Sequence, residues 1–183
     1  IHLDFSMMDW SSVDTLSHSL KARLEDTAKA YKTTVEASTA VSLLSRLVTA
    51  LAESEKVVIL IDEYDAPILK HITDIEHAVA MRNFLSNFYT TIKSLDTHLD
   101  FIFLTGVTKF SKTSIFSGMN NLRDISFSED YAAICGYTQQ ELETDFSEHI
   151  AVQAARMEQP RAELLESLRF WYNGYRFSTA PIK

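Results

Sequence analysis

Apolar and polar residues along the first hundred positions follow two different periods, which predict strands alternating with helices. Ile1 to Phe5 alternate in polarity, a pattern typical of a half-buried strand. Continuous apolar runs at Val57–Ile61 and Phe101–Leu104 are instead typical of strands covered on both faces of a parallel sheet. Because segments of helical periodicity separate the runs, we expect parallel strands joined by helical crossovers.

The helical segments are preceded by side chains that can cap a helix. Helices are predicted from Ser11 or Ser12 to Tyr31, from Ser38 or Thr39 to Leu51, and from Thr73 to about Leu95. Thr73 and Glu76 have the spacing of a capping box at the start of the third helix. The resulting order of elements predicts an α/β fold, with a parallel sheet flanked by helices.

The rest of the chain is predicted to be a long loop followed by helices. Residues 107–127 have no clean period and many polar side chains, so we expect a loop there, with a short strand at Asp124–Phe127. Two helices are predicted after it, from Thr138 to Met157 and from Pro160 to about Tyr172. Thr138 and Glu141 form a second capping box. The C-terminal part is therefore expected to be helical.

The composition narrows the class of protein. Of the 183 residues, 46% are apolar, as in globular chains that bury a core. The formal net charge is −8, so the net charge does not support nucleic acid as a partner. The single cysteine, Cys135, cannot form an internal disulfide, and no apolar run is long enough to span a membrane. We therefore expect a cytoplasmic protein without a membrane partner.

The main candidate for chemistry is the end of the second strand, where the apolar run stops at Asp62, Glu63 and Asp65. Ligand sites in parallel sheets lie beyond the carboxyl ends of strands, and carboxylates buried there need a cation or hydrogen-bond donors. An apolar strand ending in Asp-Glu is the pattern of the Walker B element of P-loop ATPases. Asp62 is then expected to hold Mg²⁺ and Glu63 to activate the attacking water. The alternative is a core strand followed by a solvated acidic turn.

Thr105 ends the next predicted strand. In ATPases with an additional strand between Walker A and Walker B, this position carries sensor 1, which contacts the γ-phosphate or the attacking water. Thr105 is therefore a candidate catalytic residue, although a threonine at a strand end can also simply form a turn.

A Walker A loop is absent from the sequence. The four glycines nowhere form Gly-x-x-x-x-Gly-Lys-Ser/Thr, the loop that would cradle the phosphates of ATP. In a P-loop fold this unit would come before Ile1. We therefore expect a portion of a domain that begins after Walker A, is inactive alone, and binds ATP and Mg²⁺ only together with the missing loop.

Five segments form an ordered set of motifs along the chain. They are IDEYDAPI at 61–68, FLTGVTKF at 103–110, SIFSGMNNL at 114–122, ICGYT at 134–138 and WYNGYRFS at 171–178. Together they resemble the predicted AAA-ATPase-like family of bacteria and archaea, over nearly the whole chain. The resemblance implies a P-loop ATPase fold with a Walker A before Ile1, and often a restriction-nuclease-like domain after the ATPase region.

Two further interpretations concern charged residues. Lys109 and Arg123, together with Lys112, are candidate nucleotide-binding residues, or they are solvated charges of a loop. The three carboxylates after the second strand could form a nuclease metal site instead. Such sites usually add a lysine on an adjacent strand, whereas Lys56 lies at the opposite end of the same strand.

The sequence thus predicts the Walker B to sensor 1 portion of an ATP-hydrolysing P-loop domain of the additional-strand type. Residues 1–127 are expected to form the partial ATPase core, and residues 128–183 the helical C-terminal part of the same region. The expected partners are ATP, a second copy in a homo-oligomer, and a C-terminal nuclease-like domain in the full protein. The alternative is a non-catalytic scaffold for protein interactions, with the loop at 107–127 binding the partner.

Overall fold

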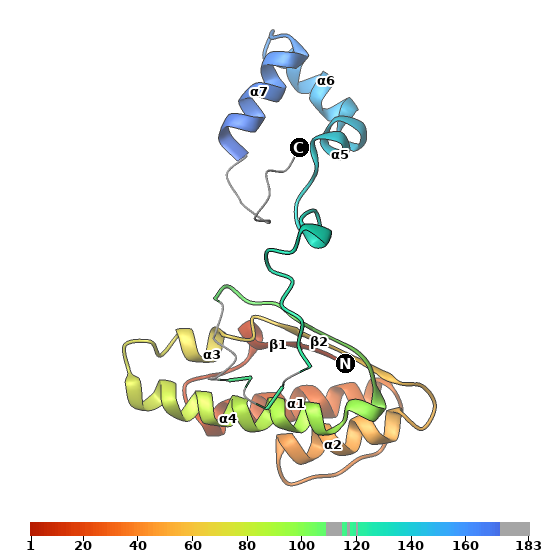
Figure 1. The fold of residues 1–183 in the computed structure, drawn as a ribbon, viewed down its shortest axis with the longest axis vertical. Coiled ribbons are helices and arrows are strands. Elements are labelled where there is room, and N and C mark those ends of the chain that lie inside the picture. Colours follow the sequence, from red (N-terminus) through yellow and green to blue (C-terminus); the bar gives the residue numbers. More distant parts are fainter. Residues whose placement is uncertain (109–114, 117, 120, 173–183) are drawn as a thin grey trace. The chain divides into compact units, whose positions relative to one another are not determined.

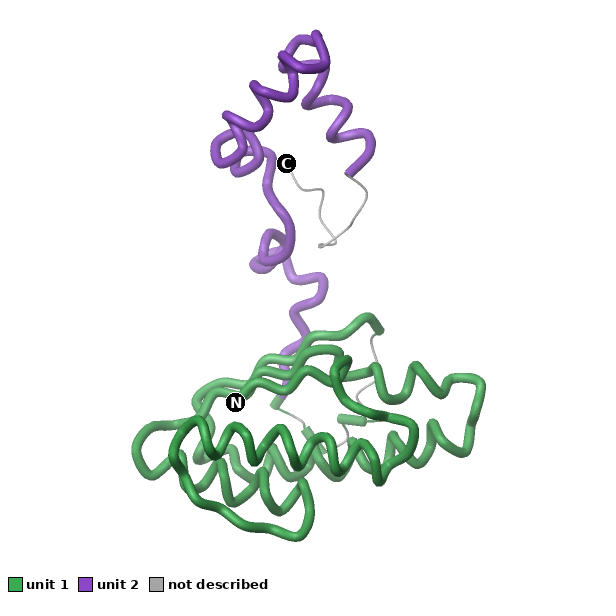
Figure 2. Tube along the Cα trace, turned by 180° about the vertical axis from the view of Figure 1, so that it is seen from behind, with its two compact units in different colours: residues 1–121 green, residues 122–183 purple. Residues whose placement is uncertain are grey.

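The computed structural model describes residues 1–108, 115–116, 118–119 and 121–172. The chain divides into two compact units, residues 1–121 and residues 122–183 (Figure 2). Each unit is described by itself below. The expectation that 1–127 and 128–183 are parts of one ATPase region stays a prediction.

Unit 1 is built on a three-stranded parallel sheet (Figure 1). Its strands are β1 (His2–Asp4), β2 (Val57–Asp62) and β3 (Leu99–Leu104), in the order β1-β2-β3. Asp4 pairs with Asp62, and Ile61 pairs with Leu104, so the carboxyl ends of the strands lie at one edge of the sheet. This confirms the predicted α/β class with a parallel sheet, while the additional-strand type stays a prediction.

The helices of unit 1 begin at capping side chains. They are α1 (Val13–Ala30), α2 (Ala40–Leu51), α3 (Ala66–Leu69) and α4 (Ile75–Ser94), with 3₁₀ turns at Phe5–Met7 (η1) and Asp96–His98 (η2). Ser12 caps α1 and Thr39 caps α2, as predicted. The predicted capping box at Thr73 is wrong. Asp74 caps α4 instead, since its carboxylate accepts a hydrogen bond from the backbone N–H of His77 at 3.1 Å.

The core of unit 1 lies on one side of the sheet, where α1, α2 and α4 are gathered (Figure 1). Side chains of β2 alternate between buried and exposed: Ile59 and Ile61 are 0% and 2% exposed, whereas Val58 and Leu60 are 37% and 40% exposed. The prediction that this strand is covered on both faces is therefore wrong for the part of the chain that the structure describes. Its described helices cover one face only, and Phe101 on β3 is also exposed.

Unit 2 contains short helices, and the last three of them contribute to a small core. The helices are η3 (Glu129–Tyr131), α5 (Gln139–Asp145), α6 (Ser147–Arg156) and α7 (Arg161–Tyr172). The capping box of Thr138 and Glu141 is confirmed. The helix predicted to continue to Met157 is interrupted at Phe146, whose ring packs edge-on against Tyr137 at 4.9 Å between centroids. The strand predicted at Asp124–Phe127 is wrong, because these residues form irregular chain and a turn.

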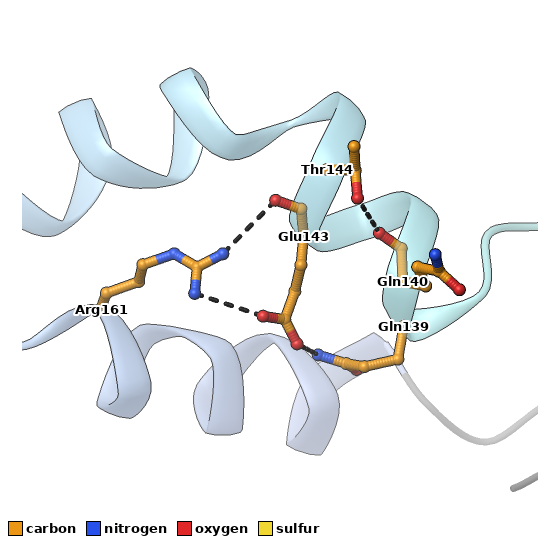
Figure 3. A network of polar contacts seen from close by, with 5 residues as sticks. All are labelled: Gln139, Gln140, Glu143, Thr144 and Arg161. Carbon is orange, nitrogen blue, oxygen red and sulfur yellow. Dashed lines mark hydrogen bonds and ion pairs between the residues drawn. The ribbon is translucent and has the colours of Figure 1, made fainter.

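A polar network joins α5 to α7 in unit 2 (Figure 3). Arg161 donates to the Glu143 carboxylate at 3.2 Å and to its backbone oxygen at 3.4 Å. Gln139 donates to the other carboxylate oxygen at 2.7 Å. The bond from Gln139 is the larger cause, and Arg161 the next, of a pKa of Glu143 below its ordinary value.

Among the described residues, no helix has the length and apolarity required to cross a membrane.

Candidate functional site

The carboxyl ends of β2 and β3 bring together two segments from distant parts of the sequence, residues 62–65 and residues 105–108. The backbone ladder continues past the last paired residues, because Thr105 N–H donates to the Ile61 oxygen at 2.9 Å. Tyr64 N–H in turn donates to the Thr105 oxygen at 3.0 Å. These bonds fix the two segments beside each other at the edge where parallel sheets bind ligands.

Asp62 and Thr105 are in direct contact at this edge. The Thr105 hydroxyl donates a hydrogen bond to Oδ1 of Asp62, and the Glu63 N–H donates to the same oxygen at 3.0 Å. Asp62 is exposed and Thr105 is half-buried, so the pair is accessible from solvent. Two of the residues that the sequence selects for catalysis and metal binding therefore share a hydrogen bond, and their chemical roles stay a prediction.

Glu63 adopts a left-handed backbone conformation with φ of 53°. This conformation costs a residue with a Cβ atom about 1–2 kcal/mol. Its backbone oxygen accepts a hydrogen bond from Ala66 N–H at 3.0 Å, which closes the turn leading into α3. Backbone strain of this kind gathers at functional sites, where the surrounding structure enforces it. Glu63 is therefore held at the strand end in a conformation that its own preferences disfavour.

Asp65 does not face solvent with the other two carboxylates. It is 0% exposed, and it is the only charged side chain in the buried class among the residues that the structure describes. Its oxygens accept hydrogen bonds from Val107 N–H at 3.3 Å and from both the N–H and the hydroxyl of Thr108 at 2.5 Å. Since the described chain also contains no group of three residues suited to hold a metal ion, the nuclease-type carboxylate cluster finds no support.

Gly106 lies against Tyr64 and Asp65 with no space for a side chain. A Cβ atom on Gly106 would stand 2.6 Å from Oδ1 of Asp65 and 2.7 Å from the Tyr64 ring. The Tyr64 hydroxyl donates to the Thr108 oxygen at 2.5 Å, and its ring packs on Phe116 with centroids 5.2 Å apart. Any side chain at position 106 would therefore force Tyr64 or Asp65 to move.

Tyr89 of α4 lies in the core of unit 1, and it was not among the residues selected from the sequence. Its side chain is fully buried, and its ring packs on Phe116 with centroids 5.0 Å apart. Burial, followed by the nearby Tyr64 and Asp65, raises the pKa of the Tyr89 phenol well above its ordinary value. The phenol oxygen has no hydrogen-bond partner within the described chain. The only sign of this residue in the sequence was a tyrosine among the apolar positions of a predicted helix.

Three basic residues are candidates from the sequence. Lys109 and Lys112 lie outside the described residues. Arg123 belongs to unit 2, where its guanidinium lies 3.4 Å from the Asp130 carboxylate and 5.6 Å from the centroid of the Tyr131 ring. Both members of this ion pair are exposed. A nucleotide contact by any of the three residues stays a prediction.

Comparison with known proteins finds one matching family model and a similar bacterial protein. The sequence model of the family described as Predicted AAA-ATPase matches residues 1–116, which include both strand ends. A protein of Azotobacter chroococcum mcd 1, described as "Uncharacterized protein in vnfD 5'region", is 45% identical over 127 residues, or 69% of this chain. The chain spans 23% of the length of that relative. No solved structure shows significant similarity to the chain.

Proposed function

Because this chain belongs to the predicted AAA-ATPase family, we propose that the ends of β2 and β3 form the metal- and water-handling half of an ATP-hydrolysing P-loop domain of the additional-strand type. The observation that carries this proposal is the contact between Asp62 and Thr105 at the carboxyl edge of the sheet. The phosphate-binding loop that such a domain needs is not among the 183 residues. The proposal therefore concerns the protein in which this chain works together with that loop.

Asp62 is the residue that binds Mg²⁺ in this proposal. Its exposed carboxylate is oriented by two donors on Oδ1, the Thr105 hydroxyl and the Glu63 N–H. Carboxylate oxygens suit Mg²⁺, which keeps several of its waters and is bound by one or two carboxylates plus substrate phosphates. A site of this kind needs no third protein ligand. Asp62 would hold the cation, which would neutralise charge that develops on the phosphates of ATP.

Glu63 orients and activates the attacking water. It directly follows Asp62, is half-buried, and is held by a strained backbone conformation. A carboxylate fixed beside the phosphate can accept the proton of the water, a contribution that is typically worth 10²–10⁴-fold in rate.

Thr105 contacts the terminal phosphate. A threonine hydroxyl has a single hydrogen, and here that hydrogen is donated to Asp62. To donate to a phosphate oxygen, the Thr105 O–H bond would rotate away from Asp62 while the side chain keeps its χ1 rotamer. With Asp62 holding the cation, the hydroxyl hydrogen would be free for the phosphate, so the free and nucleotide-bound sites would differ in this one bond.

The test is Glu63→Gln in the protein that carries both this chain and its phosphate-binding loop. The variant should bind ATP normally and lose turnover by about 10²-fold or more. Glu55→Gln, an exposed change before β2, is the matched control and should leave both properties unchanged. Turnover by Glu63→Gln at the unaltered rate would disprove the assignment.

Titration of the 183-residue chain with Mg-ATP provides a second test. We expect no detectable binding, because the backbone amides that cradle phosphates are missing. Tight binding would contradict the proposed division of the site. A longer protein that neither binds nor hydrolyses ATP would favour the non-catalytic scaffold.

A further inference from the structure

The segment after β3 is held by two neighbouring residues, Tyr64 and Asp65. Asp65 accepts hydrogen bonds from Val107 N–H at 3.3 Å and from the N–H and hydroxyl of Thr108 at 2.5 Å. Tyr64 donates its N–H to the Thr105 oxygen at 3.0 Å and its hydroxyl to the Thr108 oxygen at 2.5 Å. Together, these bonds fasten both ends of the segment 105–108. We call Tyr64 and Asp65 the clamp.

Because Asp65 is buried, the clamp favours one backbone conformation of the segment 105–108. A carboxylate without access to water is costly unless donors compensate it, and Asp65 is 0% exposed. Val107 and Thr108 supply those donors from a segment 42 and 43 positions further along the chain. If the loop moved away, the buried carboxylate would lose its compensation. The carboxylate therefore disfavours other conformations of the loop.

Packing around Gly106 further restricts the backbone of the segment 105–108. The Tyr64 ring and the Asp65 carboxylate lie so close to Gly106 that even a methyl group would overlap both. The Tyr64 ring is itself fixed against Phe116. The chain between Thr105 and Thr108 is thus confined by contacts as well as by hydrogen bonds.

We propose that Tyr64 and Asp65 are positioning residues that keep the Thr105 side chain in the χ1 rotamer that places its hydroxyl oxygen beside the Asp62 carboxylate. The clamp touches the Thr105 backbone oxygen directly, and it fixes the next three residues. The catalytic consequence rests on the proposed function, in which Asp62 and Thr105 act on Mg-ATP. The geometric part does not, since it concerns the orientation of one side chain in the free protein.

The geometric part is tested by NMR, through three-bond couplings to the Thr105 methyl group that report its χ1 angle. One rotamer should dominate in the unaltered protein, and the couplings should average over rotamers in Asp65→Asn and in Thr108→Val. Thr108→Ser keeps the hydroxyl donor, so Thr105 should stay in a single rotamer in this variant. Asp26→Asn, at an exposed position, and Thr91→Val, at a half-buried position like that of Thr108, are matched controls and should leave the couplings unchanged.

Thr108→Val removes only one donor and leaves both backbone N–H groups on Asp65, so it should stay folded even where Asp65→Asn does not. A Thr105 side chain that keeps one rotamer in folded Thr108→Val would overturn the proposal. Equal averaging in the controls would overturn it as well.

The catalytic part is tested by a double-mutant cycle on turnover in the protein that hydrolyses ATP. Asp65→Asn should lower kcat by about tenfold to 10²-fold with KM nearly unchanged, because misplacing a catalytic group affects the transition state more than substrate binding. In a Thr105→Val background, Asp65→Asn should lower kcat no further. Independent, multiplicative losses would refute a role through Thr105. Absence of any ATP turnover would instead count against the proposed function, while the NMR result would still decide the clamp.

Discussion

The hydroxyl of Thr105 donates a hydrogen bond to the Asp62 carboxylate, and this bond links two side chains at the ends of neighbouring parallel strands. The same pairing recurs three residues further along both segments, where Thr108 donates to Asp65. The two aspartates differ in exposure, since Asp62 is exposed and Asp65 is fully buried. The outer pair is therefore accessible from solvent, whereas the carboxylate of the inner pair is enclosed by the protein.

Removal of the Thr105 hydroxyl should lower the rate of ATP hydrolysis and leave the thermal stability of the protein unchanged. If the proposed function holds, Thr105→Val in a protein that combines this chain with a phosphate-binding loop should lower kcat for ATP hydrolysis by about 10²-fold, the cost of deleting one donor to a transition-state oxygen. Thr105→Ser retains the donor and should lose much less. Steady-state kinetics measure the effect, and thermal unfolding serves as the control. A Thr105→Val protein with unaltered kcat would exclude the sensor role.

Gly106→Ala should destabilise unit 1, because the new methyl group would meet Asp65 and the Tyr64 ring at 2.6 and 2.7 Å. Overpacking of this kind costs about 1–3 kcal/mol of unfolding free energy, which chemical denaturation can measure. An unaltered unfolding free energy in Gly106→Ala would show that Tyr64 and Asp65 can move aside without cost.

The strand ends could be predicted from the sequence because apolar runs and their polar stops are local signals. The positions of Asp62 and Thr105 followed from where two such runs end, and parallel pairing then placed them side by side. Their hydrogen bond was beyond prediction, since it depends on the register between strands. Asp65 gave no local sign of burial, because its donors come from Val107 and Thr108.

Other differences have similar physical causes. Thr73 and Asp74 are both capable of capping α4, and only the backbone path decides between them. A continuous apolar run such as Val57–Ile61 carries no alternation, so the sequence could not reveal that described helices cover only one of its faces. The interruption at Phe146, where the ring also contacts Tyr137, was not predicted because the apolar stripe continues through it.

The one-sided burial of β2 leads to a contrast between adjacent residues. Ile59→Ala should cost about 2–5 kcal/mol of unfolding free energy, because Ile59 is 0% exposed. Leu60→Ala should cost about 1 kcal/mol or less, because Leu60 is 40% exposed. Denaturant titration of both variants of the 183-residue chain tests this difference. A large loss in Leu60→Ala would mean that the second face is covered as well.

Tyr89→Phe should leave unit 1 as stable as before or stabilise it by about 1 kcal/mol, because it removes a buried hydroxyl that has no partner among the described residues. A clear loss of stability would show that the hydroxyl is hydrogen-bonded, for example to a buried water.

The same tyrosine predicts a pH effect. The pKa of Tyr89 is raised by burial, so its phenol stays neutral in the folded protein at a pH where the unfolded chain has begun to ionise. Its contribution to stability is complete below the ordinary tyrosine pKa and is lost as pH rises above it towards the raised folded pKa. Denaturation at several alkaline pH values should show a smaller decline in Tyr89→Phe. An identical decline would contradict this.

Glu141 should make the start of α5 sensitive to acid. Its carboxylate accepts hydrogen bonds at 2.8 Å from the N–H and from the hydroxyl of Thr138, and these bonds lower its pKa, with the N–H bond as the larger cause. A depressed folded pKa gives stabilisation that is complete above the ordinary glutamate pKa and is lost as pH falls through the folded value. Hydrogen exchange of the α5 amides should therefore accelerate below about pH 4, relative to its intrinsic pH dependence. Glu141→Gln keeps an acceptor in the capping box and should abolish this pH dependence, whereas Glu53→Gln in unit 1 should preserve it. Persistence of the acid response in Glu141→Gln would assign it to another group.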